Sequence, residues 1–207
     1  MRPGPFHLLA GAGASLLIAA ACSAPPAAAP PPAGTGSTPF MVTATIKDLM
    51  DSEVDPSADY LWESVATTVT RAGIDERQPR TDEEWKMVRR SAITLVEATN
   101  LLVMEGRHVA KPGEKSENPG IELGPEEIQK IIDSDRASFI KFAHALHDAG
   151  MQALTAIDAR NVEGLLNAGE VIDTACENCH LKYWYPDSEQ ANEAKKAAAS
   201  LRKKPVN

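Results

Sequence analysis

Two cysteines one helical turn apart, followed at once by a histidine, constrain this chain more than any other feature. Cys176 and Cys179 stand three positions apart, and His180 comes directly after them. A Cys-x-x-Cys-His run is the attachment motif of a c-type haem, whose iron is then held by the imidazole as its proximal ligand. The motif therefore predicts one covalently attached haem c, bound by Cys176, Cys179 and His180.

A redox dithiol and half of a zinc site are the competing interpretations of this motif. A thioredoxin-like dithiol belongs to a strand–helix–strand setting, which the sequence does not show. A structural zinc site needs four ligands, and the only other cysteine is Cys22. No histidine has finger-like spacing to the pair; this includes His108, His144 and His147. Haem attachment fits the pattern best.

Residues 1–21 have the composition of a secretory signal peptide. Arg2 precedes a short apolar core, residues 8–21, that is too short and too rich in Ala and Gly to span a bilayer stably. Cys22 follows three alanines, where a bacterial lipoprotein signal places its acylated cysteine, although Ala19 stands where Leu is usual. Cleavage at a nearby Ala-x-Ala site, without acylation, is the alternative. Either way we expect a periplasmic protein, and with acylation a membrane-anchored lipoprotein.

The chain after Cys22 divides into a tether, a domain and a tail. Residues 22–40 form a tether rich in Pro and Ala, in which residues 23–39 reach about 50 Å when extended as polyproline II. Residues 41–186 have the length of one domain, and residues 187–207 form a polar tail that is helical by propensity. The net charge of −8 argues against a nucleic-acid partner. No glycine-rich phosphate loop and no Ser/His/Asp signature is present.

Apolar residues recur at helical spacing through four ranges of the domain. The first range is 43–71, in which Asp55-Pro56 is expected to kink or restart the helix. The second range begins at the capping box Thr81–Glu84 and closes at Gly106.

The third and fourth ranges complete the predicted fold. The third begins at Pro125 and continues through Ile157, and the fourth is capped by Asn161, contains the haem motif and is ended by Pro186. The sequence therefore predicts an all-α fold, an up-down-up-down four-helix bundle with the haem near the end of the fourth helix.

With these features the chain resembles the cytochrome c′ superfamily, four-helix bundles that carry Cys-x-x-Cys-His near the end of the fourth helix. The motif residues carry the resemblance, and similar exported proteins share the character of residues 46–50, 80–85 and 183–186. The resemblance covers the helical domain and not the tether. Some relatives form homodimers through their first two helices, and the sequence leaves open whether this chain does so.

Bundle topology limits the residues that can face the iron from the distal side. The end of the fourth helix lies level with the start of the first, the end of the second and the start of the third. Four candidate ligands come from that end: Met41, Met50, Met104 and His108. Two other histidines, His144 and His147, lie about 30 Å into the third helix.

Met50 is the predicted sixth ligand of the iron. The resemblance implies either an apolar distal residue, which leaves the iron five-coordinate, or a first-helix methionine, and Met50 matches the second pattern. A methionine that only fills the core is the alternative. A His/Met iron is coordinatively saturated and suits electron transfer between redox partner proteins, so we expect an electron carrier and not an enzyme. An open distal face would bind NO or CO, and peroxidase chemistry would need a polar pair, for which Arg107-His108 is the one candidate within reach.

Overall fold

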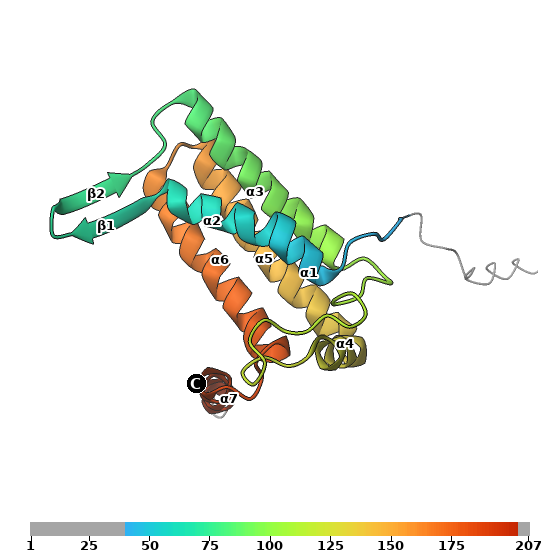
Figure 1. Ribbon diagram of the computed structural model, residues 1–207. Coiled ribbons are helices and arrows are strands. Elements are labelled where there is room, and N and C mark those ends of the chain that lie inside the picture. Colours follow the sequence, from blue (N-terminus) through green and yellow to red (C-terminus); the bar gives the residue numbers. More distant parts are fainter. Residues whose placement is uncertain (1–39, 203–207) are drawn as a thin grey trace, which may run out of the picture. The chain divides into compact units, whose positions relative to one another are not determined.

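Helices make up most of the structure between residues 40 and 202, the part of the chain that the computed structural model describes (Figure 1). The predicted signal peptide, Cys22 and all but the last residue of the predicted tether lie outside the described residues. Within the described part, no helix combines the length and the apolar character needed to cross a membrane.

The first helical segment changes its winding part-way along. It consists of α1 (Ile46–Leu49), the π-helical turn η1 (Met50–Val54) and α2 (Asp55–Ser64). Thr45 caps the start, because its hydroxyl accepts a hydrogen bond from the Asp48 backbone N–H at 3.0 Å. The π turn ends at Asp55, so the helix restarts as an α-helix at Asp55-Pro56.

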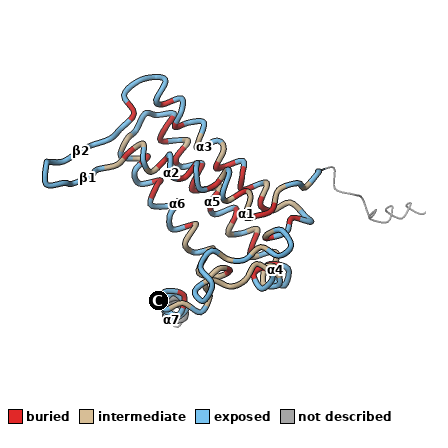
Figure 2. The backbone as a smooth tube through the Cα atoms, viewed as in Figure 1, coloured by how far each residue is buried: buried red, intermediate tan, exposed pale blue. Residues whose placement is uncertain are grey.

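A β-hairpin follows at residues where the sequence predicts more helix. Strand β1 (Ala66–Thr70) pairs antiparallel with β2 (Gly73–Arg77), and Val69 lies opposite Ile74. The predicted helix over 43–71 is therefore wrong beyond residue 64. Both strands lie away from the helices and are exposed along almost their whole length (Figure 2).

The predicted capping box at Thr81 begins α3 (Asp82–Leu102). The Glu84 backbone N–H donates to the Thr81 hydroxyl at 3.2 Å, and the Glu84 carboxylate accepts from the Thr81 backbone N–H at 2.9 Å. At the other end, two guanidinium groups donate to carbonyls of the last turn. Arg107 binds that of Leu101, which also accepts from the Met104 backbone N–H, and Arg136 binds that of Val103.

The predicted third helix is two helices, α4 (Pro125–Ser134) and α5 (Arg136–Asp158). They are separated at Asp135, whose backbone leaves the helical region with φ −143° and ψ 57°. The Asp135 carboxylate accepts a hydrogen bond from the Ser138 backbone N–H at 3.2 Å and so caps α5. The continuous helix expected over this range is wrong, because an N-cap residue interrupts a pattern whose apolar period continues across it.

The last two helices are α6 (Val162–Tyr183) and α7 (Glu189–Arg202). Asn161 caps α6 as predicted, by accepting from the Gly164 backbone N–H at 2.9 Å. The α7 helix covers residues 189–202 of the polar tail.

Each of the long helical segments packs against two others: α2 against α3, α3 against α5, α5 against α6 and α6 against α2. Neighbours run antiparallel. Arg89 early in α3 pairs with Asp158 at the end of α5, whereas Arg136 at the start of α5 reaches the end of α3. The buried apolar side chains of all four segments form one continuous core.

Close approach of α2 to α6 depends on Gly169. The Trp62 indole N–H donates to the Gly169 carbonyl at 3.0 Å, and a Cβ at this glycine would lie 3.0 Å from the Trp62 ring. A side chain here would require the Trp62 ring to shift by a few tenths of an ångström, so this glycine helps to determine how Trp62 of α2 lies against α6.

Candidate functional site

The α6 helix presents Cys176, Cys179 and His180 on one face. Residues three and four positions apart are neighbours on a helix surface, so the two sulfur atoms and the imidazole project in related directions. All three side chains are half-buried, and both cysteines are free thiols. The face points into the space enclosed by the four long helical segments.

A cavity of about 200 Å³ lies beside this face. The two thiols, His180 and Met50 all line it, so the structure brings together the four site residues that the sequence predicts. Most of its remaining wall is apolar and comes from α6 and the helical segments around it: Ile46, Val54, Ala58, Trp62, Leu102, Phe139, Phe142, Ala143, Leu146, Ala175 and Trp184. The arrangement suits an apolar group that is held by a few specific side chains.

A second cavity of about 170 Å³ adjoins the first. The two share Met50, Asp55, His180 and Trp184 as lining residues. The imidazole and the thioether therefore border both spaces, and together the cavities extend from the helical interior to the loop that precedes α4.

Met50 is the one predicted distal candidate that lines the thiol cavity. It opens the π-helical turn, in which the Asp55 backbone N–H donates to the Met50 carbonyl, a hydrogen bond five residues long instead of four. Single π turns within α-helices are rare and are frequent at functional sites. Met50 also packs against the hydrophobic core, so the π turn is a second feature of its position beside that packing.

The other three distal candidates lie elsewhere. Met41 is 93% exposed, before the first helix. Met104 contacts the Arg107 guanidinium through its sulfur at 3.5 Å and does not line the cavity. His108 is exposed and lines a different cavity beside the start of α4.

Arg107 has a structural role. It is 5% exposed, and its guanidinium donates to the carbonyls of Leu101, at 2.6 Å, and Ala44. Burial lowers the pKa of this guanidinium below its ordinary value. Its donors bind main-chain carbonyls outside the cavity, so neither Arg107 nor His108 is positioned to act as a polar distal pair.

Two aromatic rings flank the His180 imidazole. The ring centroids of Trp184 and Tyr185 lie 5.8 Å and 6.0 Å from that of His180. The Tyr185 hydroxyl donates to the Glu177 carboxylate at 2.6 Å, and the pKa of Tyr185 is raised, first by burial and then by this hydrogen bond. Tyr183, by contrast, is fully buried and packs edge-on against the rings of Phe139 and Phe142, so it belongs to the core.

Burial keeps both thiols protonated at neutral pH. It raises the pKa of Cys176 to about 11 and that of Cys179 to about 12. Dithiols that exchange disulfides have the opposite property, a lowered pKa that supplies thiolate. The local environment is therefore unlike that of a thioredoxin-type site.

Three carboxylates on the cavity wall were not predicted from the sequence. Asp55, Asp173 and Glu177 line it, and partial desolvation raises the pKa of Asp55, which the nearby His180 opposes. Asp173 lies one turn before Cys176, and Glu177 lies within the motif. Their nearness to the motif on the same helix could have indicated that these two carboxylates line the cavity. Across the described range 40–202, no three or more His, Cys, Asp or Glu side chains cluster as a metal site. A haem iron needs only one or two protein ligands, so it does not depend on such a cluster.

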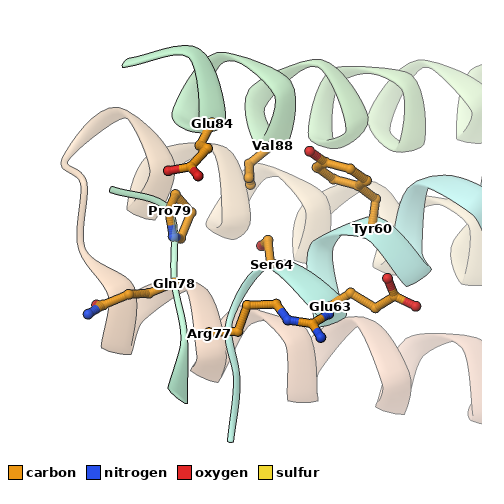
Figure 3. Close-up of a pocket in the computed structure, with 8 residues that line it drawn as sticks. All are labelled: Tyr60, Glu63, Ser64, Arg77, Gln78, Pro79, Glu84 and Val88. Carbon is orange, nitrogen blue, oxygen red and sulfur yellow. The ribbon is translucent and has the colours of Figure 1, made fainter. Parts of the chain in front are cut away.

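A further cavity, of about 210 Å³, lies at the opposite end of α2, beside the base of the hairpin (Figure 3). Its lining includes Glu63 from α2, Arg77 from β2 and Glu84 from α3. The Glu84 carboxylate is engaged by the backbone N–H groups of Arg80 and Thr81. The lining contains no cysteine and no histidine, so it offers none of the ligand chemistry of the first cavity.

Comparisons of the chain with models of protein families, with curated proteins and with solved structures found no match. The function of the chain is therefore inferred from the residues of the cavity and from the sequence motif.

Proposed function

We propose that the chain is an exported c-type cytochrome that carries electrons through a single haem in the thiol-lined cavity. The observation that supports this most strongly is the meeting of two free thiols, an imidazole and a thioether around one largely apolar cavity. Haem is a large apolar ring with an iron at its centre, and these donors are the types that attach the ring and bind the metal. The residues present therefore fit the group.

Attachment is the role we assign to Cys176 and Cys179. Their thiols would hold the haem by adding to its two vinyl groups, an addition that joins sulfur to carbon and releases no leaving group. The helical spacing of the cysteines suits two such bonds to one ring. His180, one residue further, is the proximal ligand, and the rings of Trp184 and Tyr185 limit the orientations of its imidazole.

Met50 is the residue we assign to the distal side. The bound haem supplies an iron that alternates between the ferric and ferrous states. A thioether from Met50 would favour the ferrous state and would exclude other ligands from the iron, which suits transfer of electrons. Leu102 of α3 and the apolar side chains of α5 line part of the cavity. Within this proposal the four antiparallel segments are a four-helix haem bundle of the c′ type.

Binding of NO or CO is the alternative function if Met50 does not ligate the iron. The ferric spectrum and the Met50→Ala variant separate the two. We expect a low-spin ferric protein with a methionine–iron band in the far red, and no CO binding by the ferrous form. Met50→Ala should lose the band and bind CO.

Met104→Ala is the matched control, because Met104 also comes from the haem end of the helices but does not line the cavity. We expect its spectrum and its CO response to match the unsubstituted protein. A high-spin spectrum of the unsubstituted protein, or failure of Met50→Ala to gain CO binding, would remove Met50 as ligand and leave gas binding as the better proposal.

Export and anchoring complete the proposal. The signal-like residues 1–21 and Cys22 support a periplasmic lipoprotein, and they lie outside the described residues. Cys22→Ser should move the protein from the membrane fraction to the soluble periplasmic fraction while its haem content stays the same. Retention of the variant on membranes would contradict acylation at Cys22 without affecting the haem assignment.

A further inference from the structure

The residues that follow α6 turn back towards His180. The helix ends at Tyr183. Beyond it, the backbone N–H groups of Trp184 and Tyr185 both donate to the His180 carbonyl, at 2.8 Å and 3.1 Å. From the loop before α4, the Leu123 backbone N–H donates to the Trp184 carbonyl at 2.8 Å. Main-chain hydrogen bonds therefore fix this segment relative to His180.

A side-chain hydrogen bond then fixes the Tyr185 ring. Its hydroxyl donates to the Glu177 carboxylate at 2.6 Å, a length typical of a bond to an ionised acceptor. Glu177 stands three positions before His180, so the two are neighbours on the helix surface. The Tyr185 ring thus extends from the helix end to Glu177 alongside the imidazole, with the two ring planes at 62°.

Glu177 differs from the other two carboxylates of the thiol cavity. Asp55, Asp173 and Glu177 line this cavity, and among its described lining residues there is no Lys or Arg. Of the three, Glu177 is the one whose side chain accepts a hydrogen bond within the range 40–202. Tyr185 lines the adjoining cavity, and His180 lines both. The hydrogen bond therefore joins the two cavities beside His180.

The charge of Glu177 acts on any group that occupies the thiol cavity. A carboxylate near a haem favours the ferric state, because its negative charge stabilises the higher positive charge of the iron. A hydroxyl that donates to the carboxylate reduces the charge that the cavity experiences. The same bond also limits movement of the ring that lies beside the imidazole.

We propose that Tyr185 is a positioning residue of the haem site that acts through Glu177: their hydrogen bond holds the Tyr185 ring beside His180 and raises the reduction potential of the iron. This inference rests on the proposed function, since it needs a haem bound by His180. Glu177 occupies a position that the Cys-x-x-Cys-His motif leaves unspecified. The pair would thus adjust the iron without binding it.

A potentiometric titration of the haem-loaded chain at pH 7 tests the effect of charge. At one applied potential, Tyr185→Phe should lower the ratio of ferrous to ferric protein at least about threefold, because the full charge of Glu177 then faces the cavity. Glu177→Gln removes that charge and should raise the ratio by a similar factor. Tyr60→Phe is the matched control, because it removes the same atom from a tyrosine at the hairpin end of α2. A Tyr185→Phe ratio equal to that of Tyr60→Phe would overturn the proposal.

A double variant tests whether Tyr185 acts through Glu177. With Glu177→Gln already present, Tyr185→Phe should change the ratio by less than about 1.5-fold, because no charge remains for the hydroxyl to reduce. Effects of the two substitutions that simply multiply would mean that the residues act independently, which contradicts the proposal.

The ferric electron paramagnetic resonance spectrum tests the positioning, because its g values depend on the orientation of the axial imidazole. Glu177→Gln should keep the spectrum, since an amide oxygen still accepts from the Tyr185 hydroxyl, whereas Glu177→Ala and Tyr185→Phe should both alter it. Identical spectra for all three variants would overturn the positioning role.

The mass of the polypeptide separates this inference from the proposed function. If covalent haem is present in every variant and neither the ratio nor the spectrum responds to Tyr185→Phe, the positioning role fails and the haem proposal stands. An unsubstituted secreted chain without covalent haem would overturn both.

Discussion

The two ends of α2 lie in contrasting surroundings. At one end Asp55 follows the π turn of Met50 and lines the cavity with His180, while at the other Ser64 leads into strands that are exposed on both faces. Four helical segments enclose the first region, and so several independent contacts determine where each side chain lies. Nothing in the described chain packs over the strands. Chemistry that needs fixed positions belongs to the first region, and contact with another molecule suits the second.

The largest expected difference between the regions is in haem content. Replacing both Cys176 and Cys179 by Ala should abolish covalent haem, because no sulfur remains on the cavity wall to join the ring apart from the Met50 thioether, which has no S–H to add. Replacing residues 66–77 by a short Gly/Ser turn should leave the haem content unchanged. The mass of each polypeptide after acid denaturation measures this, and covalent haem on the double-alanine variant would contradict the assignment.

Two isoleucine substitutions test how much each region contributes to the free energy of unfolding. Ile172 on α6 is fully buried, so Ile172→Ala should lower the free energy of unfolding by about 2–5 kcal/mol through lost burial and a new cavity. Ile74→Ala in the hairpin should change it by less than about 0.5 kcal/mol, because that side chain is mostly exposed. Denaturant unfolding of the monomer measures both. Similar losses for the two variants would mean that the hairpin is part of the folding core.

A smaller expected effect is the response of the cavity end to acid. Lys182 donates to the Asp135 carboxylate at 2.8 Å, and this hydrogen bond, followed by those from Ser138, lowers the pKa of Asp135 to about 2. A carboxyl whose folded pKa is lowered adds stability above its ordinary pKa of about 4, and that stability is lost as the pH falls towards 2.

Asp135→Asn should therefore lose less stability than the unsubstituted protein between pH 5 and pH 2, when urea unfolding is measured at both. Some dependence should remain, because Lys111 likewise lowers the pKa of Asp48 to about 2. Asp75→Asn in the hairpin is the control, since Asp75 has no salt bridge within the described residues, and it should not alter the pH dependence. An Asp135→Asn profile identical to the unsubstituted one would contradict the role of this ion pair.

Sequence patterns predicted the elements whose ends have their own local signals. The Thr81 capping box and the Asn161 cap lie where expected, because a cap is a contact between residues three positions apart and is visible in the sequence. The prediction over 43–71 was wrong in its last part, since Val65 and Val69 match the helical period by spacing alone. Val69 is exposed, and the β-branched run at residues 67–70 was the better indicator of a strand.

Apolar periodicity also concealed the interruption at Asp135. Ile132 in α4 and Phe139 in α5 are both buried, so the pattern continues through a residue that is not helical. The residues that line the cavity were easier to predict than the structural features around the cavity. The motif and the order of the helices left four distal candidates, and the resemblance selected Met50, which lines the cavity with His180. The π turn and the buried Arg107 depend on tertiary contacts that no local pattern records.

The π turn absorbs one additional residue between Met50 and α2. A hydrogen bond from residue i+5 accommodates one residue more than the ordinary bond from residue i+4. Deleting one residue between Met50 and Asp55 would therefore allow regular winding and leave the helix before and after the deletion in about the same relative orientation. The loss of one codon is thus tolerable at this turn, whereas the same loss within the regular winding of α2 would rotate everything before it by about 100° around the helix axis.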